Sequence, residues 1–252
     1  MKKLVFSCAV LIAGFGAMMT VGCKKKSNSS PPANPTISCT TCVTAAEAKA
    51  ENDNSSKGTY KGVIVGSSGT IKFDIGNSDS TIRAFMVIDG VKDTLAATIK
   101  WVSGVSYVSS FTGTFNGQPA SINFSVDANG GNPTVTSMNI PGHPSATLTM
   151  SKETSDNLIE CFEGSIVDIT TGETGTFDMM LSTKLKKWSA QVRTTGQTSS
   201  SSVSGVIDGT KLSFDDGKGS TGNATLSGDK IIDGTWVNNK PEHGTWIATR
   251  TL

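Results

Sequence analysis

The sequence predicts an all-β protein built from two tandem antiparallel meander units, each a small up-and-down barrel or a barrel-like sandwich. Three observations support this fold class. Apolar residues recur at every second position, which is the period of a strand with one buried face. Dipeptides typical of tight hairpin turns separate these stretches, and the pattern occurs twice along the 252 residues. The alternative is one larger barrel or sandwich with pseudo-twofold symmetry, in which each copy forms one half.

Alternation is clear in many short segments, such as Ile71-Lys72-Phe73, Ile122-Asn123-Phe124 and Trp188-Ser189-Ala190. The turn dipeptides between such segments are Asp89-Gly90, Asn116-Gly117, Asn129-Gly130, Asp208-Gly209 and Gly228-Asp229. Strands joined by turns this short are antiparallel neighbours. Seven or eight strands can be counted in each unit, and a meander of that length tends to close so that its edges are paired.

The two units are recognised by stretches that recur in the same order. Tyr60–Val65 matches Phe162–Val167, Gly69–Asp74 matches Gly175–Asp178, and Phe111–Gly117 matches Val203–Gly209. Ordered matches of this kind indicate a tandem duplication. We therefore expect β-domain 1 at residues 58–150 and β-domain 2 at residues 158–252, with the polar segment Ser151–Asn157 as the joint.

The last segment, Lys230–Leu252, predicts a β-hairpin in which Gly234-Thr235-Trp236 is echoed by Gly244-Thr245-Trp246. Its expected buried positions are Ile232, Trp236, Trp246, Ala248 and Leu252. Core packing is the default for both tryptophans because a buried indole removes a large area from water. If the barrel instead holds a small apolar or sugar ligand, Trp236 and Trp246 are the residues expected to contact it, with the neighbouring glycines leaving room.

The amino terminus has the form of a secretory signal peptide at residues 1–22, with two lysines before an apolar core from Leu4 to Val21. Its end, Gly22-Cys23, resembles a bacterial lipobox, in which the signal is cut before a cysteine that is then acylated, for instance with palmitate. Thr20 departs from that pattern, since leucine is usual there. The resemblance implies lipidation of Cys23 and attachment to a membrane. An uncleaved signal anchor is the alternative.

Residues 23–57 are expected to form a lipidated flexible tether, because few large apolar side chains occur there. Thr44 and Glu47 have capping-box spacing, so a short helix is expected after Cys42. Cys39 and Cys42 are candidates for a disulfide, either with each other or with Cys161. A redox dithiol and free thiols are the alternatives.

The sequence shows no recognisable catalytic constellation, metal-ligand cluster or cofactor motif. Its 22 basic and 21 acidic residues balance without a basic stripe, so nucleic-acid binding is not expected. His143 and His243 both lie at turns, which could be comparable places in the two copies but lack accompanying ligands. Gly217–Gly222 has the spacing G-x-G-x-x-G, yet strand alternation follows it, so we interpret it as a hairpin loop.

Aromatic-x-Gly at strand starts, S-G-x-hydrophobic-x-G hairpins and the closing Gly244-Thr245-Trp246-x-Ala248-x-Arg250 resemble uncharacterised envelope lipoproteins of Bacteroidota-type bacteria. The resemblance implies a lipid anchor in the cell envelope. No acidic run follows Cys23, which favours the periplasmic face of the outer membrane. We expect a non-enzymatic binding or interaction module for a small apolar or sugar ligand or an envelope protein. A periplasmic hydrolase with an unrecognised site is the alternative.

Overall fold

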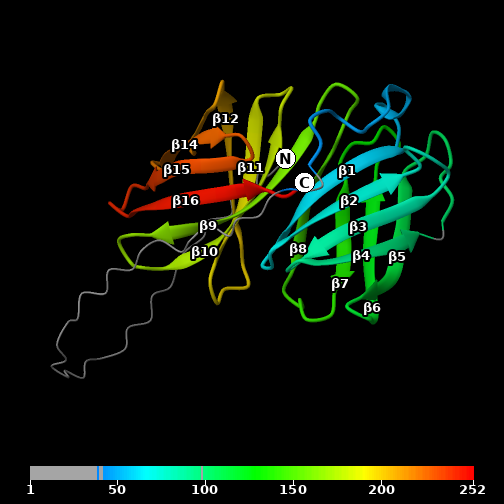
Figure 1. Cartoon of the computed structure of the whole chain (residues 1–252), viewed down its shortest axis with the longest axis horizontal. Helices are drawn as coiled ribbons and strands as arrows, with labels where there is room; N and C mark the ends of the chain where they lie inside the picture. The colour runs from blue at the N-terminus through cyan, green and yellow to red at the C-terminus, as the bar shows by residue number, and fades with distance from the viewer. Residues whose placement is uncertain (1–38, 40–41, 98) are drawn as a thin grey trace, which may run out of the picture. The chain divides into compact units, whose positions relative to one another are not determined.

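The computed structural model describes residue 39, residues 42–97 and residues 99–252. The expected signal peptide and the lipidation residue Cys23 lie outside these residues. The described strands form two eight-stranded antiparallel sheets, which follow one another along the chain (Figure 1). The prediction of an all-β protein with two tandem meander units is therefore confirmed, and the single larger barrel is wrong. In the described ranges no helix is both long and apolar enough to cross a bilayer.

The first unit runs in the order β7-β6-β5-β4-β3-β2-β1-β8. Its strands are β1 (Gly58–Val65), β2 (Gly69–Ile75), β3 (Ile82–Ile88), β4 (Val91–Ala97), β5 (Tyr107–Phe115), β6 (Gln118–Val126), β7 (Thr134–Asn139) and β8 (Thr147–Lys152). The last strand returns to pair with β1, whereas β7 and β8 share no ladder, so the ring of strands has one open seam.

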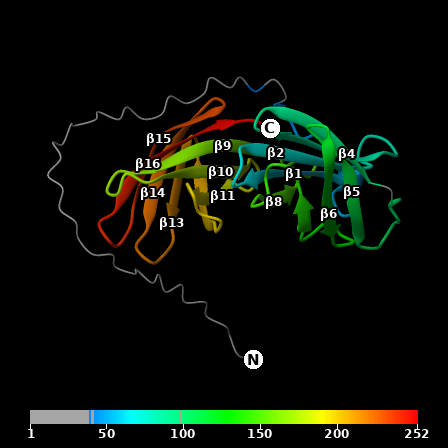
Figure 2. The same ribbon diagram turned by 90° about the horizontal axis from the view of Figure 1, so that it is seen from below.

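The second unit is a closed barrel, because β16 pairs with β9 as well as with β15. Its strands are β9 (Ile159–Asp168), β10 (Thr174–Ser182), β11 (Lys187–Thr194), β12 (Ser201–Asp208), β13 (Lys211–Asp215), β14 (Thr221–Ser227), β15 (Lys230–Val237) and β16 (His243–Arg250). Figure 2 shows from a second side how these strands curl into a ring.

Two of the three sequence matches fall at equivalent places in the two units. Gly62 of β1 and Gly164 of β9 each face the last strand of their own unit, and each sits tightly against that strand's backbone. The third match is wrong, because Phe111–Gly117 belongs to the fifth strand of its unit and Val203–Gly209 to the fourth. Glycine-containing hairpins recur between neighbouring strands, so this motif does not show which strands of the two units correspond.

Each unit has its own hydrophobic core. In the first unit the rings of Phe73, Phe111 and Phe124 meet at the centre, with ring centroids 4.8 to 6.0 Å apart. A third, smaller cluster joins the units and contains Val63 of β1 and Met180 of β10. Every residue of β1 is buried, because one face packs into the first core and the other faces the second unit.

Residues 43–57, which we call the N-terminal strap, pack against the folded units, so the flexible tether expected as far as Lys57 is wrong for this part. The carbonyl of Val43 accepts a hydrogen bond from Arg250 Nη2 at 2.6 Å. Ser56 is fully buried, and its hydroxyl accepts a hydrogen bond from Trp101 Nε1 at 2.8 Å. The strap is thus ordered by contacts that are distant in sequence, which local composition cannot reveal.

The helix expected after Cys42 does not form. The strap contains one short 3₁₀ turn, Ala50–Asn52. Glu47, expected to cap a helix, instead places its carboxylate 3.3 Å from Lys61 Nζ and 2.8 Å from Lys72 Nζ. These ion pairs use the acceptor that a capping box would need.

A disulfide joins Cys39 and Cys42. Cys161 is buried and free, so it does not take part in a bridge with either of them. Burial raises the pKa of the Cys161 thiol to about 12. A thiol with so high a pKa is not a nucleophile at neutral pH.

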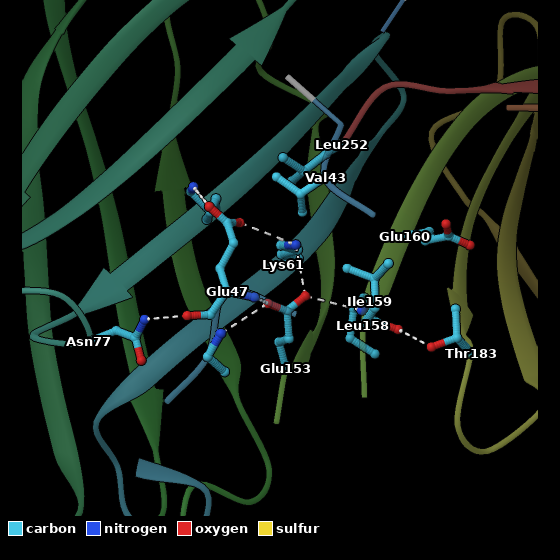
Figure 3. A network of polar contacts seen from close by, with 12 residues as sticks. Val43, Glu47, Lys61, Asn77, Glu153, Leu158, Ile159, Glu160, Thr183 and Leu252 are labelled. Carbon is cyan, nitrogen blue, oxygen red and sulfur yellow. Dashed lines mark hydrogen bonds and ion pairs between the residues drawn. The ribbon is translucent and has the colours of Figure 1, made fainter. Parts of the chain in front are cut away.

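Glu153 is a fully buried carboxylate that holds three parts of the chain together (Figure 3). One oxygen accepts a hydrogen bond from the backbone of Glu47 in the strap at 2.6 Å. The other accepts from the backbone of Ile159 at 3.1 Å and lies 2.7 Å from Lys61 Nζ. The segment Ser151–Asn157 is therefore no loose joint: β8 extends into it, and Glu153 fastens the start of the second unit to β1.

Candidate functional site

The second barrel contains a cavity of about 750 Å³ at one end. Its lining residues come from β9 to β13, β15 and β16, and from the loops that connect β9 to β10, β13 to β14 and β15 to β16. The opposite half of the barrel is filled by core side chains such as Leu181, Leu212 and Ile231. The volume falls within the range of about 300 to 1,000 Å³ that is usual for small-molecule sites.

The cavity has an apolar interior. Phe177 and Trp246 are each 2 % exposed, and their rings stack with centroids 4.5 Å apart. The other apolar lining residues are only partly buried and are Ile166, Val192, Val203, Phe214 and Trp236. A concave apolar surface left open to water is typical of a site that another molecule covers.

Both tryptophans expected to contact a ligand line this cavity. Trp246 lies opposite Gly234, and Trp236 lies opposite Gly244 on the neighbouring strand. A methyl group on either glycine would stand 2.7 Å from a ring carbon of the facing indole. The expectation that these glycines leave room for a ligand is therefore wrong: the indoles themselves occupy that room and lie against the barrel wall.

A β-bulge in β15 decides which residues of the last hairpin face inward. The hairpin forms as predicted, but the register with β16 shifts between Ile231 and Gly234. Asp233 has a φ of 55° at this point. As a result Ile231, rather than the expected Ile232, is fully buried. The bulge adds one residue to the strand, so strict alternation from Trp236 backwards selects the wrong side chain.

The rim of the cavity is polar and acidic. Its carboxylates are Asp168, Glu173, Asp215 and Asp216, and its hydroxyls are Thr174, Thr194, Ser201, Ser202, Ser204 and Ser220. Asn238 completes the polar lining, and the lining contains no lysine, arginine or histidine.

Two rim carboxylates are held ionised by turn geometry. Backbone hydrogen bonds from Ser220 and Lys218 to Asp216 lower the pKa of that carboxyl. Slight burial acts to raise the pKa of Asp168, but backbone hydrogen bonds from Thr171 and Thr170 lower it overall.

The barrel wall is split beside the cavity. The ladder between β12 and β13 pairs only Val206, Ile207 and Asp208 with their partners, so these strands separate towards the rim. A second hollow of about 570 Å³ lies there and shares Ser204, Phe214 and Asp215 with the cavity. The two hollows adjoin at this split.

The remaining residues singled out in the sequence do not form a second site. His143 Nδ1 lies 2.8 Å from Ser67 Oγ in the first unit, whereas His243 Nδ1 lies 3.2 Å from Thr170 Oγ1 in the second. The two histidines therefore serve separate turns. Gly217 and Gly219 lie in the hairpin loop between β13 and β14, as interpreted, and Gly222 lies in β14. Among the described residues no three histidine, cysteine or acidic side chains are grouped as a metal site would require.

Sequence reasoning missed a pair of carboxylates between the units. Asp178 of β10 is 1 % exposed and lies opposite Glu163 of β9. Burial, and secondarily the charge of Glu163, raises the pKa of Asp178 to about 8. Burial also raises the pKa of Glu163, which accepts a hydrogen bond from Ser68 of the first unit. Both acids occupy outward positions of their strands, which look solvent-facing until the other unit covers them.

Arg193 of β11 reaches from the second unit to the first. Its guanidinium donates to the carbonyl of Ser145 at 2.7 Å and to Thr147 Oγ1 at 3.2 Å, both in the first unit. It also donates to Ser200 Oγ at 2.9 Å. These contacts hold the loop after β11, which leads to the cavity rim, against the first unit.

No known protein-family model matches the chain, and no curated protein does so.

Proposed function

We propose that this chain is a non-enzymatic, lipid-anchored protein of the cell envelope whose second barrel binds a small ligand with an apolar part. One observation carries the proposal: the barrel contains a hollow of about 750 Å³ whose walls include two aromatic residues, Phe214 and Trp236, that are only partly buried. Leaving such walls uncovered costs free energy, since burial of apolar surface contributes about 25 cal/mol per Å². A ligand that covers them recovers this energy.

The polar groups of the rim support binding better than catalysis. The serines and threonines there have no histidine beside them in the cavity lining, so the pairing of a hydroxyl with an imidazole base is absent from the lining. One carboxylate oxygen of Asp168 and one of Asp216 accept hydrogen bonds from the backbone of their own turns. Groups of this kind orient a ligand at the entrance of a pocket.

The expected lipid anchor would place the proposed binding site near a membrane. Lipidation at Cys23 would tie the chain to the outer membrane on the periplasmic side, where molecules with an apolar part are abundant. The N-terminal strap begins at residue 43 and is fixed to both units through Glu153 and Arg250. A membrane attachment upstream of the strap would therefore hold the barrel close to its source of ligand.

The proposal is tested by filling the cavity. Val203→Phe adds a ring inside the rim at a partly buried lining position, while Val237→Phe adds the same ring at a position that is 49 % exposed. The mature chain with Cys23→Ser, which carries no lipid, is titrated with envelope lipids and glycans while tryptophan fluorescence is recorded. We expect binding in the parent and in Val237→Phe, and its loss in Val203→Phe. Equal titrations in all three proteins, or no ligand for any of them, would refute the proposal.

A further inference from the structure

Building on the proposed function, we propose that the cavity selects a positively charged amphiphile. An amine or quaternary ammonium group would lie at the acidic rim, and an aliphatic or aromatic body would lie against Trp236 and Phe214. The inference combines the hollow aromatic interior with the charge of the groups that surround its entrance.

The rim has a net negative charge, which the attraction between Lys218 and Asp216 offsets only in part. Asp168, Glu173, Asp215 and Asp216 line the cavity, and none of them takes part in an ion pair among the described residues. The nearest loops add Glu242, together with Lys218 and Lys240, which lie outside the lining. Four carboxylates at the entrance of the cavity raise the local concentration of cations and repel anions.

The aromatic walls favour the same charge. Trp236 and Phe214 line the cavity and are only partly buried, so their rings can be contacted by a ligand, and a cation over an indole face is attracted by the negative face of the ring. The rim hydroxyls can accept hydrogen bonds from an ammonium group. The aromatic walls and the acidic rim therefore both favour a positively charged ligand over a neutral or negatively charged one.

The split between β12 and β13 allows the ligand to be longer than the cavity. Asp215 and Phe214 border both hollows, so a charged group at Asp215 can be joined to an apolar chain on either side of Phe214. A neutral sugar could also stack on an indole and donate to carboxylates, but it would leave the net negative charge of the rim without a ligand counter-charge. The experiment must therefore distinguish a neutral sugar ligand from a positively charged one.

Three ligands with the same octyl chain separate the cases: octyltrimethylammonium, octyl β-glucoside and octyl sulfate, each used below its micelle concentration. They are titrated into the mature Cys23→Ser chain by calorimetry and fluorescence at low and high salt. We expect the ammonium ligand to bind at least about tenfold more tightly than the glucoside, and the sulfate to bind most weakly. High salt should reduce the preference, because the rim is open to solvent.

A paired variant tests the residues. Glu173→Gln with Asp215→Asn removes two rim charges while keeping similar shapes, and Asp208→Asn removes one exposed charge at the opposite end of the same barrel. The rim variant should lower affinity for the ammonium ligand about fivefold or more and leave affinity for the glucoside unchanged. The distal variant should behave like the parent.

Each outcome decides between the proposals. Tighter or equal binding of the glucoside would overturn the charge preference and leave the proposed binding function standing. An unchanged preference in the rim variant would also overturn it. Absence of binding for all three ligands, with Val203→Phe giving the same traces as the parent, would overturn both.

Discussion

Asp178 should make the protein less stable as the pH rises from about 4 to about 8. Its carboxyl is almost fully buried opposite Glu163, and its pKa is raised from the ordinary 3.8 to about 8. Between these values the folded chain binds more protons than the unfolded chain, so the free energy of unfolding falls with rising pH. Above about 8 this contribution is constant. Asp178→Asn should remove it, because asparagine is uncharged and has nearly the shape of the protonated acid.

The size of the effect follows from the two pKa values. Each unit of pKa corresponds to about 1.4 kcal/mol, so the full difference corresponds to at most about 6 kcal/mol at pH 8. We expect about half of that, roughly 3 kcal/mol, because the two units can part at this surface and admit water before the barrel unfolds. Asp178→Asn should therefore be more stable than the parent at pH 8 and similar to it at pH 4.

Urea unfolding at pH 4, 6, 8 and 9 measures the prediction. Asp208→Asn, which neutralises an exposed aspartate of the same barrel, is the matched control and should follow the parent at every pH. A second comparison uses Glu163→Gln, which removes the neighbouring charge and should stabilise the parent more than it stabilises Asp178→Asn. Parallel pH curves for the parent and Asp178→Asn would show that the carboxyl keeps an ordinary pKa and would refute the reasoning.

Three further predictions concern the core, the cavity and the anchor. Lys61→Met should cost about 3 to 5 kcal/mol in a denaturant melt, because it leaves Glu153 as a buried charge without its partner, and Glu153→Gln in the same chain should recover a large part of the loss. Trp246→Ala should cost about 3 to 5 kcal/mol in the same assay, whereas Trp236→Ala, which removes a partly exposed ring, should cost clearly less; equal costs would contradict their different burial. Cys23→Ser should prevent lipidation, so mass spectrometry of the mature amino terminus should find an acyl group on the parent only.

The fold was largely predictable because its signals are local. Asn116-Gly117 illustrates this: both residues adopt positive φ, at 49° and 74°, and connect β5 to β6 as a two-residue turn. Where such a dipeptide separates two alternating segments, the strands, their direction and their neighbours follow together. The number of units could be predicted for the same reason, since each unit repeats the same local pattern.

The parts that could not be predicted depend on partners far away in sequence. Glu153 looks like a surface residue of a polar joint, yet its backbone and side-chain partners belong to the strap, to β1 and to β9. Asp178 alternates with apolar neighbours like a solvent-facing residue until the first unit covers it. The bulge at Asp233 has no glycine at the bulged position, although a glycine is what signals many bulges. In each case the prediction would have needed the contacts between segments that are distant in sequence.

The two units have the same number of strands, but only the second contains the cavity. The difference depends on where their aromatic rings lie. A ring of eight strands is just wide enough to be filled by its own side chains, and in the first unit Phe73, Phe111 and Phe124 meet at the centre and fill it. In the second unit the indoles of Trp236 and Trp246 lie across glycines of the neighbouring strand. Trp236 borders the open cavity and is only partly buried, whereas Trp246 stacks on Phe177 at the edge of the filled half. Replacing either glycine by a larger residue would push the facing indole inward, so the same pairs that build the wall also keep the site hollow.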